Sequence, residues 1–96
     1  MSLPIRLGKV LDTFDIKGRG IVVVTDTTWE QLPRDLKFKI GDPVELRMGG
    51  VVVLQTRIAG IEHCDPWSPA HLFGFLLPRD VSKADVPVGS EVWSAE

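Results

Sequence analysis

Short apolar runs rich in valine, isoleucine and phenylalanine follow one another along the whole chain, and glycine or proline separates most of them. No stretch carries the apolar period of an amphipathic helix over three turns. Such runs are typical of β-strands. We predict a loop at 26–35, one helical turn within 79–86, and strands at 6–16, 21–25, 36–40, 43–48, 51–62, 70–78 and 89–93. Six to seven short strands predict an all-β fold, namely a small antiparallel β-barrel that is closed or partly open.

Alternating side chains predict which face of each strand is buried. In residues 43–48 the apolar positions alternate with Glu45 and Arg47, which indicates a strand with one solvent-facing side. Gly49 and Gly50 follow, between two apolar runs, and predict a two-residue hairpin turn. The same parity predicts inward side chains at Val52, Leu54 and Ile58, and it groups Val10, Phe14 and Ile16 on one face of the first strand.

The totals of the chain exclude several classes of function. Its 96 residues are room for one domain, taken as 1–96. With a single cysteine, no secretory signal and no apolar span of about 18 residues, we expect a cytoplasmic protein that does not enter the membrane. A net charge of -2 disfavours general RNA or DNA binding, because such affinity comes largely from neutralising phosphates. No GxxxxGK(S/T) phosphate loop occurs, so we expect no nucleotide binding.

Four stretches stand in an order that is met in a known family. They are GRGIVVVT at 18–25, FKIGDPVEL at 38–46, TRIAGIE at 56–62 and GFLLPRDVSKADVPVGSEVW at 74–93. Together they resemble the second-domain β-barrel of translational GTPases, the domain 2 of elongation factor Tu. The resemblance covers residues 5–93 and implies a barrel of the translation-protein type. In that family the barrel works beside a G domain and helps to hold the aminoacyl end of tRNA or contacts the ribosome.

The chain also departs from the pattern of that family. Residues 25–29 read TDTTW, where the family has a glycine-containing turn, and residues 70–74 read AHLFG, where a Gly-x-x-Val-Gly opening is common. Because there is no phosphate loop, the resemblance carries over no nucleotide chemistry. No short motif maps the contacts with tRNA or ribosome, so it assigns no contact residue.

A dense group of chemically capable side chains occupies residues 62–71. Glu62, His63, Asp65 and His71 could ligate a metal if the loop brings them together, yet a structural zinc site needs four ligands, usually from two paired motifs, and there is no second cysteine pair. Cys64 and His71, oriented by Asp65, could form a nucleophile pair, but no oxyanion element is visible. The simpler interpretation is a polar connecting loop, for which we expect neither a metal nor a cofactor.

Two tryptophans lie in the predicted loops. Trp67 stands between Pro66 and Pro69, which restricts the loop and lowers the entropy lost on binding a partner. Trp29 lies in the other long loop. Both rings could cap the ends of the barrel or contact a partner, since exposed tryptophans are enriched in binding hot spots. The predicted binding residues are Trp29, Trp67, His63 and His71.

We therefore predict a stand-alone, non-catalytic β-barrel that binds a macromolecule, with a protein partner or self-association favoured over RNA. One alternative is a translation-associated accessory that contacts the ribosome or tRNA, which the family resemblance implies. The other is a small metal-dependent enzyme built on His63, Asp65 and His71.

Overall fold

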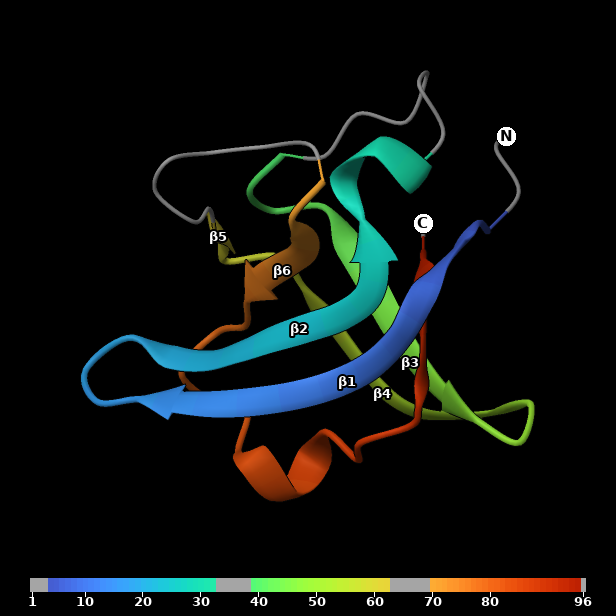
Figure 1. Ribbon diagram of the computed structural model, residues 1–96. Helices are drawn as coiled ribbons and strands as arrows, with labels where there is room; N and C mark the ends of the chain where they lie inside the picture. Colours follow the sequence, from blue (N-terminus) through green and yellow to red (C-terminus); the bar gives the residue numbers. More distant parts are fainter. Residues whose placement is uncertain (1–3, 33–38, 63–69, 96) are drawn as a thin grey trace.

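Seven antiparallel strands form one sheet in the computed structural model, which describes residues 4–32, 39–62 and 70–95 (Figure 1). Two 3₁₀ turns, η1 (Trp29–Gln31) and η2 (Lys83–Asp85), are the helical elements of this part of the chain. The strands are β1 (Arg6–Ile16), β2 (Gly20–Thr28), β3 (Pro43–Met48), β4 (Val51–Arg57), β5 (Gly60–Glu62), β6 (Leu72–Leu76) and β7 (Glu91–Ser94). The predicted all-β class is confirmed.

The order of the strands explains how the sheet becomes a partly open barrel. It is β4-β3-β7-β1-β2-β6-β5, so the two outermost strands, β4 and β5, follow each other in the chain. Figure 1 shows the long β1–β2 hairpin curving across the front of β3 and β4, so the sheet folds back over itself. Ile58 and Ala59 link β4 to β5 at the corner where the two ends of the sheet approach each other. The predicted partly open β-barrel is confirmed.

One apolar core fills the space that the sheet encloses. Five strands supply it with fully buried side chains, whereas β4 and β5 contribute only the partly buried Leu54 and Ile61. The buried core residues are Leu7, Val10, Ile21, Val23, Val44, Leu46, Ile58, Phe73, Phe75, Leu77, Val81, Val86 and Val92. The buried hydroxyl of Thr25 donates a hydrogen bond of 2.8 Å to the Phe73 carbonyl, which ties β2 to β6 inside the core. β4 therefore lies at the margin of the core.

Two β-bulges account for the side chains whose predicted orientation is wrong. The pairing of β1 with β2 shifts between Val10 and Asp12, which changes the parity of β1. Val10 is buried, but Phe14 and Ile16 are exposed, so the three residues do not share one face. In β4 the register shifts between Leu54 and Val52, and Val52 is exposed rather than inward. Leu54 and Ile58, which lie on the regular side of this bulge, face the core as predicted.

Loop and strand boundaries differ from prediction in several places, and the predicted strand 51–62 is divided at Ile58 and Ala59 into β4 and β5. β2 continues to Thr28, which pairs with Leu72 of β6, so the predicted loop at 26–35 begins as a strand. Of the predicted strand 36–40, residues 36–38 lie outside the described residues, and Lys39 and Ile40 belong to the turn before β3. The hairpin turn is confirmed, because Gly49 and Gly50 have φ angles of 60° and 82°. Within residues 4–32, 39–62 and 70–95, no helix is long and apolar enough to cross a membrane.

Candidate functional site

The structure describes three of the residues predicted from the sequence to bind a partner or a metal, namely Trp29, Glu62 and His71. Glu62 accepts a hydrogen bond of 2.7 Å from the Arg19 guanidinium. The Trp29 backbone N–H donates a hydrogen bond of 3.1 Å to the His71 carbonyl. The Trp29 ring is partly buried against the core and meets the Phe73 ring edge-on, with centroids 4.8 Å apart. His71 is partly buried, and its Nδ1 has no hydrogen-bond partner among the described residues.

The other predicted site residues, His63, Asp65 and Trp67, lie outside the described residues, as does Cys64. Within the part of the chain that the structure describes, no three histidine, cysteine or acidic side chains come together as a metal site would require. The arrangement of the predicted metal ligands therefore stays a prediction, and the position of Trp29 fits the capping interpretation.

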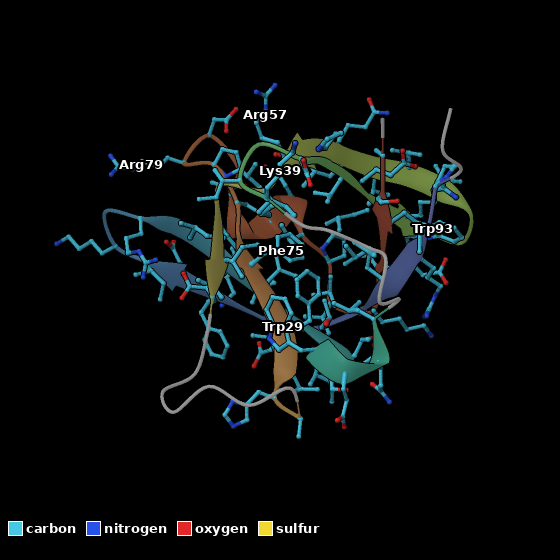
Figure 2. The ribbon with its side chains drawn as sticks, turned by 90° about the horizontal axis from the view of Figure 1, so that it is seen from above. Trp29, Lys39, Arg57, Phe75, Arg79 and Trp93 are labelled. Carbon is cyan, nitrogen blue, oxygen red and sulfur yellow. The ribbon has the colours of Figure 1, made fainter. Side chains whose placement is uncertain are left out.

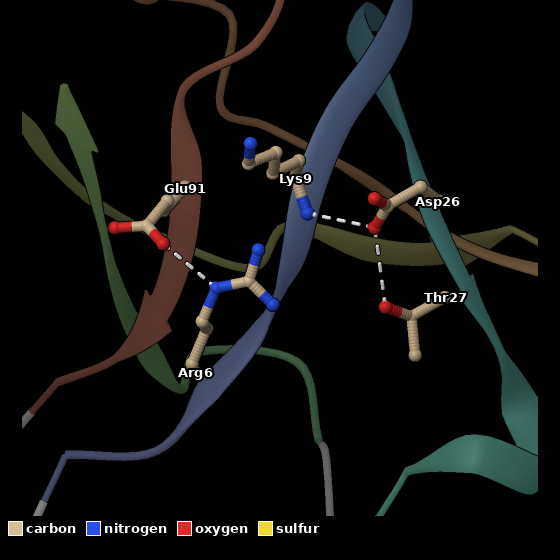
Figure 3. Close-up of polar contacts among 5 residues, drawn as sticks. All are labelled: Arg6, Lys9, Asp26, Thr27 and Glu91. Carbon is tan, nitrogen blue, oxygen red and sulfur yellow. Dashed lines mark hydrogen bonds and ion pairs between the residues drawn. The ribbon is translucent and has the colours of Figure 1, made fainter. Parts of the chain in front are cut away.

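The outer face of β1, β3 and β7 carries charges that neutralise one another. Arg6 donates to Glu91 at 2.8 Å, and Arg47 donates to Glu45 at 2.6 Å (Figure 3 shows the first pair). The Arg47 guanidinium also lies 4.3 Å from the centre of the Trp93 ring. The hydrogen bond from Arg6 holds the pKa of Glu91 below its usual value. Because these charges already have partners, this face is a weak candidate for recognising a charged ligand.

A polar hollow of about 370 Å³ includes Arg6, Gly8 and Asp26 in its lining. The Asp26 carboxylate in this hollow stabilises the local fold. Its Oδ1 accepts hydrogen bonds from the Lys9 backbone N–H at 2.9 Å and from the Thr27 hydroxyl at 3.3 Å (Figure 3). The bond from Lys9 joins β1 to β2 just beyond their last paired residues, Val10 and Thr25. We therefore assign this hollow a structural role.

The β3–β4 hairpin exposes apolar side chains at the edge of the sheet. Met48 is 39% exposed, Val51 64%, and Val52 and Val53 each 43%. These four residues, the hairpin patch, lie in a stretch from Met48 to Thr56 that contains no charged residue. Contiguous exposed apolar surface of this kind marks interaction sites in soluble proteins.

Beyond the bulge, the second half of β4 borders an open cavity of about 670 Å³. The cavity lies between β4 and the segment 78–80 that follows β6. This cavity, the seam, is lined by Gly41, Pro43, Gln55, Thr56, Arg57, Pro78 and Asp80. Its size falls in the range of about 300–1,000 Å³ that is usual for ligand sites.

Hydrogen bonds at the corner of the barrel show how the backbone of β4 is oriented. The Ile58 N–H donates to the Asp42 carbonyl at 2.9 Å, and the Ile58 carbonyl accepts from the Gly41 N–H at 2.7 Å. Both polar groups of Ile58 thus point toward β3. In a strand the N–H and C=O of one residue share a side, and the side alternates from residue to residue. The backbone groups of Gln55 and Arg57 therefore point away from β3, to the unpaired edge of β4.

The sequence explains why the ladder between β5 and β6 stops at the seam. The Ala59 N–H donates to the Leu76 carbonyl at 2.8 Å, and this is the last bond before the strands diverge. Two residues later stands Pro78, which has no N–H to offer a neighbouring strand. Continuing the register of Gly60↔Leu76 would place Arg57 beside Arg79, and like charges facing each other are unfavourable. The two edges therefore stay apart.

One cation, Arg57, lines the seam, and two more, Lys39 and Arg79, are close in the chain to lining residues. Figure 2 shows Lys39, Arg57 and Arg79 toward one end of the molecule, with the guanidinium groups extending outward in different directions. Among the described residues, none of the three takes part in an ion pair. The Asp42 carboxylate accepts a hydrogen bond from the Lys39 backbone N–H at 3.1 Å, and this bond stabilises the turn before β3. Only Asp80 among the lining residues carries a negative charge.

Sequence reasoning missed the seam because its walls are far apart in the chain. Arg57 and Asp80 are 23 residues apart, and no local motif links them. The available signal was Pro78 at the end of an apolar run, since a proline there predicts that the ladder stops.

The wall of the seam leads into η2, where an acidic side chain closes the turn. The Ser82 backbone N–H and hydroxyl donate to the Asp85 carboxylate, each at 3.0 Å, and lower the pKa of Asp85 from 3.8. A depressed folded-state pKa means that this stabilisation is present above pH 3.8 and is lost as pH falls through the folded value.

We expect Asp85→Asn to lower the thermal midpoint slightly at neutral pH, and the difference from wild type to shrink below pH 3.8. A constant difference, in thermal melts taken from about pH 7 to about pH 2, would contradict this role.

Comparison with known sequence families, curated proteins and solved structures finds no match for this chain. The case for a function therefore depends on the geometry of β4 and its surroundings.

Proposed function

We propose that this chain is a non-catalytic binding module whose partner is a protein, bound along β4. The observation that carries the proposal is the hairpin patch, which consists of Met48, Val51, Val52 and Val53 and is exposed at the edge of the sheet. An edge strand is normally protected by charges, proline or cover from another element. From Met48 to Thr56 the chain has neither a charge nor a proline. A partner that covers this strand would remove the exposed apolar surface from water.

The β4 bulge determines how a partner would approach the patch. Leu46 pairs with Leu54 and Arg47 with Val52, which leaves Val53 as the extra residue. A bulge interrupts the regular spacing of backbone groups, so it opposes uniform strand addition over the first half of β4. The partner would therefore contact this half chiefly through the valine and methionine side chains.

The test compares a patch variant with a matched control. In Val51→Ser/Val53→Ser, two exposed valines of the patch become polar; in Leu11→Ser/Val88→Ser, two equally exposed residues on β1 and in the loop before β7 change in the same way. Each protein is immobilised and exposed to extract of its source, and captured protein and RNA are measured separately. We expect the patch variant to retain about a tenth of the captured partner, with the thermal midpoint unchanged and the control unaffected.

Three further outcomes discriminate among the alternatives. Equal capture by the wild type and the patch variant would overturn the assignment to β4. Ribosomal proteins and RNA rising together would instead favour the translation-associated accessory. Sedimentation of the purified wild type tests self-association, and a dimer that the patch variant dissociates would identify the partner as a second copy of the chain.

A further inference from the structure

We infer that the seam binds an extended acidic segment of the partner, which adds to the second half of β4 as a further strand. The inference rests on the proposed function, because it specifies the chemistry of the protein that β4 binds. It depends on the backbone orientation of β4, on the charges around the seam and on the rigidity of its walls.

The backbone of β4 provides the first part of the argument. The N–H and C=O groups of Gln55 and Arg57 point away from β3, to the unpaired edge of β4, two residues apart on a stretch whose pairing with β3 is regular. Both residues also line the seam. An extended peptide can exchange main-chain hydrogen bonds with such a pair, which is the basis of strand addition at sheet edges. The seam is open here because Pro78 cannot continue the β6 ladder. A segment placed between β4 and residues 78–80 would occupy the position beside β4 that a longer β6 would fill.

The charges around the seam define the side chains of that segment. Arg57 belongs to the lining of the seam, and Arg79 stands in the chain between two lining residues, Pro78 and Asp80. The two side chains extend in different directions (Figure 2). Alternate residues of an extended segment lie about 7 Å apart on one face, so acidic residues at alternate positions can reach both arginines. Lys39 adds a third positive charge at the rim. Closing the barrel would bring Arg57 and Arg79 together and increase the repulsion between them. An acidic segment placed between them would reduce that repulsion.

A peptide fits these features better than a nucleic acid strand does. A peptide offers main-chain N–H and C=O groups that can pair with those of Gln55 and Arg57, whereas a nucleic acid backbone has no N–H group to donate. Asp80 of the lining can also accept a hydrogen bond from a peptide N–H group.

The walls of the seam are already formed, which reduces the entropy lost on binding. Ile58 and Leu77, which stand directly behind the two walls, are both 0% exposed. Leu77 is fixed by a hydrogen bond of 2.8 Å from its N–H to the Ile21 carbonyl, and the Val81 N–H donates to the Pro78 carbonyl at 3.1 Å. The segment 78–80 is thus anchored at both ends.

The experiment uses a fluorescein-labelled peptide of four Glu-Thr repeats as the probe. A peptide of four Gln-Thr repeats is the uncharged control, and a single-stranded oligothymidylate of similar charge is the phosphate control. Fluorescence anisotropy should show binding of the Glu-Thr probe to the wild type, with affinity at least about tenfold higher than for either control. Arg57→Gln should reduce that affinity about tenfold, while Lys17→Gln, a charge-matched change at the exposed β1–β2 turn, should leave it unchanged.

A second variant tests the backbone bonds separately from the charges. Gln55→Pro removes one N–H at the unpaired edge of β4, and proline is tolerated on an edge strand when its nitrogen faces away from the sheet. We expect Gln55→Pro to lower the affinity for the Glu-Thr probe with little change in the thermal midpoint. Equal binding of the Glu-Thr and Gln-Thr probes, equal effects of Arg57→Gln and Lys17→Gln, or stronger binding of the oligothymidylate would each overturn the inference. If the hairpin patch variant loses its partner while Arg57→Gln captures it normally, the proposed function stands and only the seam inference fails.

Discussion

Gly20→Ala should destabilise the fold by about 3 kcal/mol, because two separate costs add at this position. Gly20 has a φ of +129°, a backbone conformation that residues with a Cβ rarely adopt. A Cβ built on Gly20 would also lie 2.6 Å from the Leu77 carbonyl oxygen. That oxygen belongs to the backbone and cannot move aside as a flexible side chain could. The first strand pairs of β2 would therefore separate from β6.

Gly18→Ala is the matched control for this prediction. Gly18 lies in the same turn and has a φ of +82°, but nothing stands within 4 Å of a Cβ built there. The alanine should therefore cost only the backbone conformation, about 1–2 kcal/mol. Urea unfolding followed by tryptophan fluorescence measures both free energies. If the two variants lose the same stability, the close approach to Leu77 is not rigid.

The contact between Gly20 and Leu77 also bears on the seam. Leu77 is the residue before Pro78, so it stands where the chain leaves β6 and enters the seam wall. Its N–H is bonded to Ile21, and its carbonyl oxygen lies against Gly20. A Gly20→Ala protein that remains folded should therefore hold residues 78–80 less firmly and bind the acidic probe more weakly than Gly18→Ala does.

Local patterns were sufficient to predict the class of fold. The strand at 43–48 and the Gly49-Gly50 turn each depend on neighbouring residues, and both were predicted correctly. The solvent-facing side expected for that strand is wrong at Glu45, which is buried and paired with Arg47, and Met48 is exposed. The errors at Phe14 and Val52 have a different origin. A bulge inserts one residue into one strand, and its position is set by the partner strand, so periodicity within a single strand does not reveal it.

The candidate site was less predictable than the fold. The sequence directed attention to residues 62–71, where reactive side chains are close in the chain, but only three of those ten positions are described. The seam combines Arg57 with Pro78 and Asp80, which come together only because the chain bends at Ile58. That bend follows from hydrogen bonds to Gly41 and Asp42. Contacts between distant segments of this kind are not encoded in any local spacing.

Phe73→Ala should remove about 4 kcal/mol of stability, a large part of the 5–15 kcal/mol that is usual for a domain. Phe73 is 0% exposed and lies between two aromatic rings, the edge-on Trp29 at 4.8 Å and Phe75 at 5.5 Å. Alanine would leave a cavity that the rigid strands β2 and β6 cannot fill. Leu72→Ala, at the neighbouring and exposed position, should cost less than about 1 kcal/mol. Similar losses in the two variants, measured by urea unfolding, would contradict the packing of β6.

Combining Phe73→Ala with Trp29→Ala tests which role Trp29 has. If Trp29 caps the core, it loses its main ring contact in Phe73→Ala, so the double variant should be about 1 kcal/mol more stable than the sum of the two losses predicts. If the two losses simply add, the contact between the Trp29 and Phe73 rings contributes little to the stability of the fold. A Trp29→Ala protein of nearly wild-type stability that captures less partner would then extend the binding surface from β4 to the end of β2.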